Sequence, residues 1–217
     1  QATAQIEMAK FKVKDDSHLG ASIEDPNLLI ARMNLPSSYD KTSIVACGYD
    51  GKDQAAERLQ KMVKINLVKG TQMVELKVNG LSQEQSIQCA QSIFNNIKES
   101  QKMISKIIVE EAKTRLADYS LRLKDAKAFI TNYSNSDPSM ILAYLSIKND
   151  MKQLADQIDI LNNHISFALN HPTKLVSPIY SSEHKVSPRR EIVLAIGLFC
   201  GLIFGLFLMI GLRSYRI

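Results

Sequence analysis

One uninterrupted apolar run, residues 192–212 (IVLAIGLFCGLIFGLFLMIGL), constrains this chain more than any other feature of its sequence. Charged residues border the run on both sides. Coiled into a helix, the run would extend about 30 Å, which matches the hydrocarbon core of a bilayer. The pattern therefore predicts a transmembrane helix over residues 191–212, and with it a protein that is partly embedded in a membrane.

Three glycines within that run, Gly197, Gly201 and Gly205, recur at every fourth position. Such spacing places them on one helix face and lets a second helix approach closely, which matters in lipid because helices there gain no hydrophobic drive for association. The simpler alternative is that glycine is common in membrane helices. The regular spacing favours a packing face for transmembrane contact.

The charge of the chain argues against a nucleic-acid partner. The formal net charge is +5, and residues 183–217 carry five basic against two acidic side chains. The remainder is therefore close to neutral, without the basic surface that nucleic acid requires. About 170 residues precede the charged approach to the apolar run, which is enough for one domain with a core.

The cysteines leave two alternatives open. Cys200 lies inside the apolar run, so only Cys47 and Cys89 are available to pair. They can form a single disulfide or remain two buried thiols.

Residues 1–80 predict a small mixed α/β base. Residues 2–8 alternate apolar and polar side chains, as a half-buried strand does. Asp25 and Pro26 predict the start of a helix that ends near Met33, because aspartate caps helix N-termini and proline suits the first turn. Further patterns predict a strand at 43–47, a helix at 52–62 and a hairpin of strands at 63–68 and 71–78.

Residues 81–170 predict a long helical hairpin. Ser82 starts a Ser-x-x-Gln capping box, and helical spacing of apolar residues then continues to about Ile130. In residues 140–168, apolar positions alternate four-three spacing over four heptads, which predicts a coiled-coil seam. Turn-forming residues between the two helices predict the hairpin tip at Asn135, Ser136, Asp137 and Pro138.

The hairpin is followed by a proline-bearing extended linker, residues 171–190, that contains Pro178 and Pro188 and returns to the base. The predicted order is thus base (1–80), hairpin (81–170), linker (171–190), transmembrane helix (191–212) and a short cytoplasmic tail (213–217). The fold class expected is α+β, with a small mixed base near the membrane and a protruding helical hairpin. A fifty-residue helix exceeds what so small a domain can cover, so we expect oligomeric packing of the hairpins.

Catalytic, metal and cofactor patterns are not found in the sequence. The four histidines are dispersed, no Cys or carboxylate completes a ligand set, and neither a nucleophile elbow nor a phosphate loop is present. We therefore expect no enzyme activity, no metal and no cofactor.

The sequence as a whole resembles the Wzz-type polysaccharide co-polymerases, or chain-length determinants, of the kinase-free class. The resemblance rests on the alternating opening QATAQIEMAKF, the junction VELKVNGLSQEQSIQCAQSIFNNI, the long hairpin and the stretch VSPRREIVLAIGLFCGLIFG. By this comparison Pro178 and Pro188 match a proline-rich segment and Gly197, Gly201 and Gly205 a glycine face. The two prolines are more widely spaced than in a compact proline-rich signature.

The resemblance implies a bacterial inner-membrane protein whose bulk lies in the periplasm and assembles as a homo-oligomeric ring. Such proteins regulate the modal chain length of a lipid-linked polysaccharide (O-antigen, common antigen or capsule) made by a Wzy-type polymerase. A first transmembrane helix is expected before Gln1, and the absence of a nucleotide-binding domain before Ile217 favours the kinase-free class. The alternative is an envelope tether or polysaccharide-export adaptor, including the periplasmic part of a truncated tyrosine autokinase.

Overall fold

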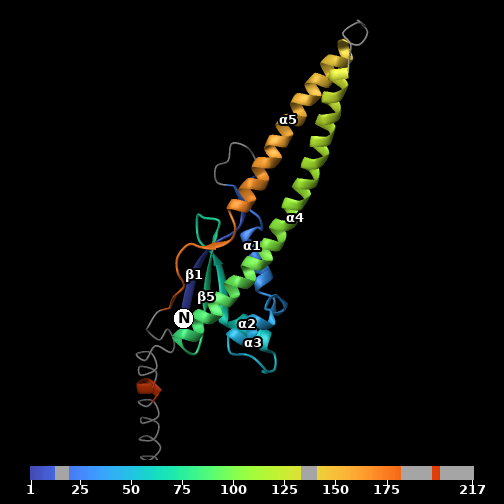
Figure 1. The fold of residues 1–217 in the computed structure, drawn as a ribbon. Coiled ribbons are helices and arrows are strands. Elements are labelled where there is room, and N and C mark those ends of the chain that lie inside the picture. Colours follow the sequence, from blue (N-terminus) through green and yellow to red (C-terminus); the bar gives the residue numbers. More distant parts are fainter. Residues whose placement is uncertain (13–19, 133–140, 182–196, 201–217) are drawn as a thin grey trace, which may run out of the picture.

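The computed structural model describes residues 1–12, 20–132, 141–181 and 197–200. The chain forms a small base built on an antiparallel sheet, from which a long helical hairpin extends (Figure 1). The elements in chain order are β1 (Ala2–Glu7), β2 (Lys10–Phe11), β3 (Ala21–Ser22), α1 (Pro26–Met33), the 3-10 helix η1 (Pro36–Ser38), α2 (Lys41–Ala46), α3 (Ala55–Met62), β4 (Val63–Leu67), β5 (Met73–Val78), α4 (Gln83–Asn132), α5 (Ile141–Asn170), β6 (Lys174–Leu175) and β7 (Tyr180–Ser181).

The main sheet is built around the N-terminal strand β1. One edge of β1 pairs with β5, which in turn pairs with β4, and the other edge pairs with β6 and β7. The chain after the helical hairpin runs back along β1, since β6 lies beside the end of β1 and β7 beside its start. All strand pairs of the described residues are antiparallel, and the hairpin expected at 63–68 and 71–78 forms the pair of β4 and β5.

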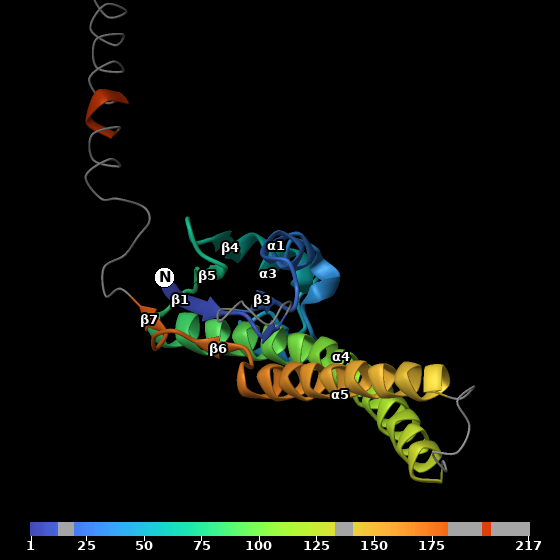
Figure 2. The same ribbon diagram turned by 90° about the horizontal axis from the view of Figure 1, so that it is seen from above.

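The predicted alternation of β1 is confirmed. Ala2, Ala4 and Ile6 are buried, whereas the residues between them are half-buried. Opposite them, Val78, Leu76 and Val74 of β5 are completely buried on the same face. This face carries the core, and α4 crosses it (Figures 1 and 2).

Only the first part of α4 belongs to the core of the base. Its buried residues follow helical spacing, and beyond Val109 the described residues of α4 are exposed or half-buried. The buried set is Ser86, Cys89, Ala90, Ile93, Phe94, Ile97, Gln101 and Val109. The prediction of an unbroken helix of about fifty residues is confirmed, and this one helix forms both part of the base and one arm of the hairpin.

The second arm of the hairpin, α5, packs on α4 along the predicted seam. Tyr144, Ile147, Met151 and Leu154 are half-buried although most of their neighbours are exposed, and Ala168 at the foot is buried. Figure 2 shows the two helices diverging toward the end of the hairpin farthest from the base. The seam is therefore packed most closely at the foot of the hairpin.

Two helix starts follow the predicted caps. Asp25 accepts a hydrogen bond from the backbone N–H of Asn27 at 2.7 Å and begins α1, with Pro26 in the first turn. Ser82 accepts one from the N–H of Gln85 at 3.1 Å and begins α4. Gln85 then accepts from the N–H of Leu81 instead of completing the expected reciprocal box.

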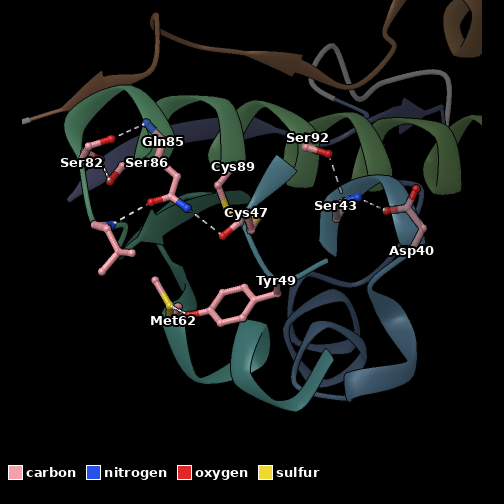
Figure 3. Close-up of a disulfide and its surroundings, with 11 residues drawn as sticks. Asp40, Ser43, Cys47, Tyr49, Met62, Ser82, Gln85, Ser86, Cys89 and Ser92 are labelled. Atoms are coloured by element: carbon pink, nitrogen blue, oxygen red, sulfur yellow. Dashed lines mark hydrogen bonds between the residues drawn. A yellow bond between two sulfur atoms is a disulfide. The ribbon is translucent and has the colours of Figure 1, made fainter. Parts of the chain in front are cut away.

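Residues 43–47, predicted as a strand, form the end of α2 and its C-cap. Asp40 accepts a hydrogen bond from the N–H of Ser43 at 3.0 Å, so a local N-cap outweighs the strand preference of the β-branched residues that follow (Figure 3). The helix predicted from residue 52 begins later, at Ala55, after Gln54 adopts a left-handed backbone conformation.

The predicted fold class is wrong in its final element. Within the described residues, no helix combines the length and apolar character needed to cross a bilayer. Of the predicted span, only residues 197–200 belong to the described part, where they are helical. The rest of residues 191–212 and the tail at 213–217 lie outside the described residues.

Candidate functional site at the foot of the hairpin

The residues singled out from the sequence do not gather into a site within the described part of the chain. Pro178 is exposed and lies between β6 and β7. A methyl group placed on Gly197 would have no neighbour within 4 Å among the described residues. The remaining predicted residues lie outside the described ranges: Pro188, Gly201, Gly205, Asn135, Ser136, Asp137 and Pro138.

A buried polar cluster, here called the Gln101 joint, connects the hairpin to the base. The side chain of Gln101 on α4 is completely buried. Its Oε1 accepts hydrogen bonds from the backbone N–H of Ala9 at 3.1 Å and from the hydroxyl of Thr173 at 2.6 Å, and its Nε2 donates to Glu24 at 3.3 Å. One amide thereby connects α4 to three segments far apart in sequence.

Glu24, the acidic member of the joint, is buried and paired with Arg32 of α1. The guanidinium donates from Nε to one carboxylate oxygen at 3.0 Å and from Nη2 to the other at 3.1 Å. Such a two-pronged pair offsets much of the cost of burying a carboxylate. The joint therefore holds α1 and the hairpin in one fixed relation.

A groove of about 460 Å³ opens beside the Gln101 joint, between α4 and the end of α5. Four lysines of α4 line it, and three of them, Lys98, Lys102 and Lys106, recur at every fourth residue and so lie on one helix face. The full lining, here called the lysine groove, is Ala9, Lys98, Glu99, Lys102, Ser105, Lys106, Val109, Glu110, Lys113, Ala168, Leu169, Pro172 and Thr173.

The charges of the lysine groove are only partly balanced. Lys102 pairs with Glu99 at 3.3 Å and Lys113 with Glu110 at 2.9 Å. Among the described residues, no ion pair within 4.0 Å includes the exposed Lys98 or Lys106. The groove therefore presents a surplus of positive charge beside an apolar floor of Ala9 and Ala168.

This groove could not be predicted from the sequence. The spacing of the lysines is visible in the sequence, but a row of charges on a helix is usually a solvated face. The floor comes from residues about 90 positions before the lysines and about 60 after them, and only the fold brings these segments together.

A disulfide joins Cys47 to Cys89 on the base, and it decides between the two alternatives that the sequence left open. Gln85, one turn before Cys89, donates to the carbonyl of Cys47 at 3.1 Å, so a hydrogen bond reinforces the same connection (Figure 3). Gly48 follows at a positive φ, and a side chain there would meet Gln85. These contacts fix α2 against the start of α4.

Two lysines beside the end of β1 lower the pKa of a carboxyl there. The Lys10 ammonium, 2.6 Å from Glu7, lowers the pKa of the Glu7 carboxyl, and Lys174 at 3.2 Å on the neighbouring β6 acts in the same direction against partial burial. In the base, burial raises the pKa of Tyr39 to about 12, and its hydroxyl donates to the carbonyl of Met33. Both perturbations have structural causes.

The likeness of this chain to a known structure is distant. No protein-family model matches the chain, and no curated protein matches it. Among solved structures, the chain is similar to the crystal structure of the periplasmic domain of a chimeric LPS O-antigen chain length regulator protein, at 9% sequence identity and a TM-score of 0.24. That likeness covers 86% of this chain and 99% of the other.

Proposed function

We propose that this protein is a non-enzymatic polysaccharide co-polymerase, which regulates the chain length of a lipid-linked surface polysaccharide made by a Wzy-type polymerase. The resemblance of the sequence to Wzz-type proteins motivates the proposal. The observation that carries it is the long hairpin, which extends from the base and exposes apolar side chains on its outer surface.

The three most exposed large apolar residues of α4 lie on one face. Met103, Ile107 and Leu121 are separated by four and by fourteen residues, so their side chains point in nearly the same direction. The seam with α5 uses other positions of α4, such as Leu116 and Leu123, which are half-buried. An apolar face that a monomer leaves in water fits a surface covered by another subunit.

The α5 arm carries a second exposed apolar group near its start, Ile141, Leu142 and Leu145. In the proposal, the face of α4 on one subunit packs beside α5 of the next, so that the hairpins form a homo-oligomeric ring. The geometry of the ring, or the time the polymerase spends on it, then sets the length of the glycan.

The disulfide supports a location in the bacterial periplasm. Disulfides persist in oxidising compartments and are rare where glutathione and thioredoxin keep thiols reduced. Cys47 and Cys89 are both buried, so their bond is part of the core of the base.

The test replaces two apolar residues on the outer face of α4, as Met103→Ser with Ile107→Ser. We expect the purified protein to lose subunits by mass measurement, and the polysaccharide of cells that carry the variant to lose its modal length on a gel. The fold should remain, because both side chains are exposed.

The matched control is Leu28→Ser with Leu35→Ser, which removes two exposed apolar side chains from the base. This variant should keep both the wild-type mass and the wild-type polymer length. A monomeric wild-type protein, or an unchanged modal length in the hairpin variant, would contradict the proposal.

A further inference from the structure

The lysine groove has features that packing of hairpins alone does not require. Lys98, Lys102 and Lys106 are spaced about 6 Å apart along α4, and Lys113 continues the row to a total length of about 22 Å. A single small anion would need donors that converge on one point. A row of ammonium groups instead matches a linear ligand with repeated negative charges.

The lysines have charge available for such a ligand. Lys98 and Lys106 have no carboxylate within ion-pair distance among the described residues, and the pairs of Lys102 and Lys113 with glutamates are solvent-exposed. Exposed pairs of this kind contribute little to stability. An incoming carboxylate can therefore contact these lysines at small cost.

The floor of the groove favours a ligand that also has apolar surface. Ala9, Val109 and Ala168 line the bottom of the groove but are almost completely buried, so the apolar surface that a ligand can reach is mainly that of the exposed Leu169 and Pro172. Sugar rings have C–H faces that can pack on such a surface, while their acidic groups reach outward. The volume of about 460 Å³ lies in the range of pockets that bind organic ligands.

We propose that the lysine groove binds a short stretch of an anionic polysaccharide, with the carboxylates of uronic-acid residues on Lys98 and Lys106 and the sugar rings on the exposed apolar surface of Leu169 and Pro172. The inference rests on the proposed function and adds to it the class of polymer that this protein handles. Its place at the foot of the hairpin would hold the glycan against the part of α4 fixed by the Gln101 joint.

Calorimetric titration of the purified full chain with oligogalacturonate at low salt tests the proposal. Neutral maltooligosaccharides of the same length are the matched ligand control. We expect binding of the acidic oligomer, no binding of the neutral one, and weaker binding as salt is added because the contacts are exposed charges.

The variant K98Q with K106Q should lower the affinity for oligogalacturonate by about tenfold, because it removes two exposed charge contacts. The matched control is K148Q with K152Q, which removes the same charge from two exposed positions of α5 outside the groove. The control should bind within about twofold of the wild type.

Several results would overturn the proposal: no binding of oligogalacturonate, equal binding of both oligosaccharides, or equal weakening in both variants. Lysine-dependent binding to vesicles of anionic phospholipid without binding to oligogalacturonate would assign the groove to a lipid surface instead. A change of subunit number in K98Q with K106Q would assign it to a subunit interface.

The outcomes also separate this inference from the proposed function. If the protein controls polymer length in cells but does not bind oligogalacturonate, the proposed function holds and the groove assignment is wrong. If the protein binds oligogalacturonate through Lys98 and Lys106 but its deletion from cells leaves the polymer length unchanged, the groove assignment holds and the proposed function is wrong.

Discussion

The base and the hairpin share one helix but bury it very differently. Ile97 lies in the part of α4 that crosses the sheet and is 0% exposed, whereas Ile107, ten residues later, is 67% exposed. The base closes its own core with a sheet, short helices and a disulfide. Beyond Val109, the described part of the hairpin packs along the seam between α4 and α5.

This difference indicates where each region obtains its stability. Burial and a covalent bond stabilise the base within one chain. The far part of the hairpin has few buried side chains and, under the proposed function, gains contacts only through assembly. Substitutions of similar chemistry should therefore change the free energy of unfolding strongly when they lie in the base and only slightly when they lie in the far part of the hairpin.

The largest effect should come from the disulfide. Replacing Cys47 and Cys89 by serine frees a loop of 42 residues and should lower the free energy of unfolding by about 4 kcal/mol if the bond acts through the entropy of the unfolded chain. Urea denaturation without reductant measures it. The control is Cys200→Ser, which removes the free cysteine. Equal midpoints for all three proteins would show that the base does not depend on the bond.

A matched pair on α4 compares the two regions directly. Ile97→Ala should cost about 3 kcal/mol because it leaves a cavity in the core, whereas Ile107→Ala should change the unfolding free energy by less than about 0.5 kcal/mol. Thermal or urea unfolding of the monomeric fraction measures both. Similar losses of unfolding free energy at the two sites would show that the base and the hairpin are not stabilised differently.

The Gln101 joint lies where the two regions meet. Gln101→Met keeps the volume but removes the partners of the Ala9 N–H and of Thr173, so we expect a loss of about 2 kcal/mol. Amide hydrogen exchange should show faster exchange at Ala9 and in the foot of α5. Unchanged protection there would show that the hairpin is held by apolar packing alone.

The smallest effect concerns pH. Because Lys10 lowers the pKa of Glu7 below its ordinary value of 4.5, the ionised carboxylate stabilises the folded state above that pH. The contribution is lost as the pH falls through the lowered folded-state pKa. Glu7→Gln should remove less than about 1 kcal/mol of this acid-dependent stability. Parallel stability curves for the variant and wild type between neutral and acidic pH would contradict the assignment.

Local patterns predicted the elements whose signals were internal to one segment. The alternation of residues 2–8, the cap at Asp25 and the long apolar periodicity of α4 and α5 all appear in the structure. The strand expected at residues 43–47 is wrong, because the side chain of Asp40 caps a helix there and this cap outweighs the strand preference of the β-branched residues. The resemblance to Wzz-type proteins and the ring assembly stay predictions.

The candidate site could not be predicted in the same way. Lys98, Lys102 and Lys106 have a regular spacing, yet nothing in that spacing says whether a floor lies beside them. The floor requires the chain to bring Ala9 and Ala168 to the same place. Likewise, Gln101 is a common polar residue in a helical pattern until its burial and its three partners are known.

The sequence by itself determined the periodic parts of this protein, namely a central strand with one buried face and two long helices with a shared seam, because periodicity depends on neighbours within one segment. Tertiary structure decided the antiparallel order of the sheet, the Cys47–Cys89 bond, the Gln101 joint and the lysine groove. Each of these joins residues that are far apart in sequence, and such pairings arise only when the whole chain packs.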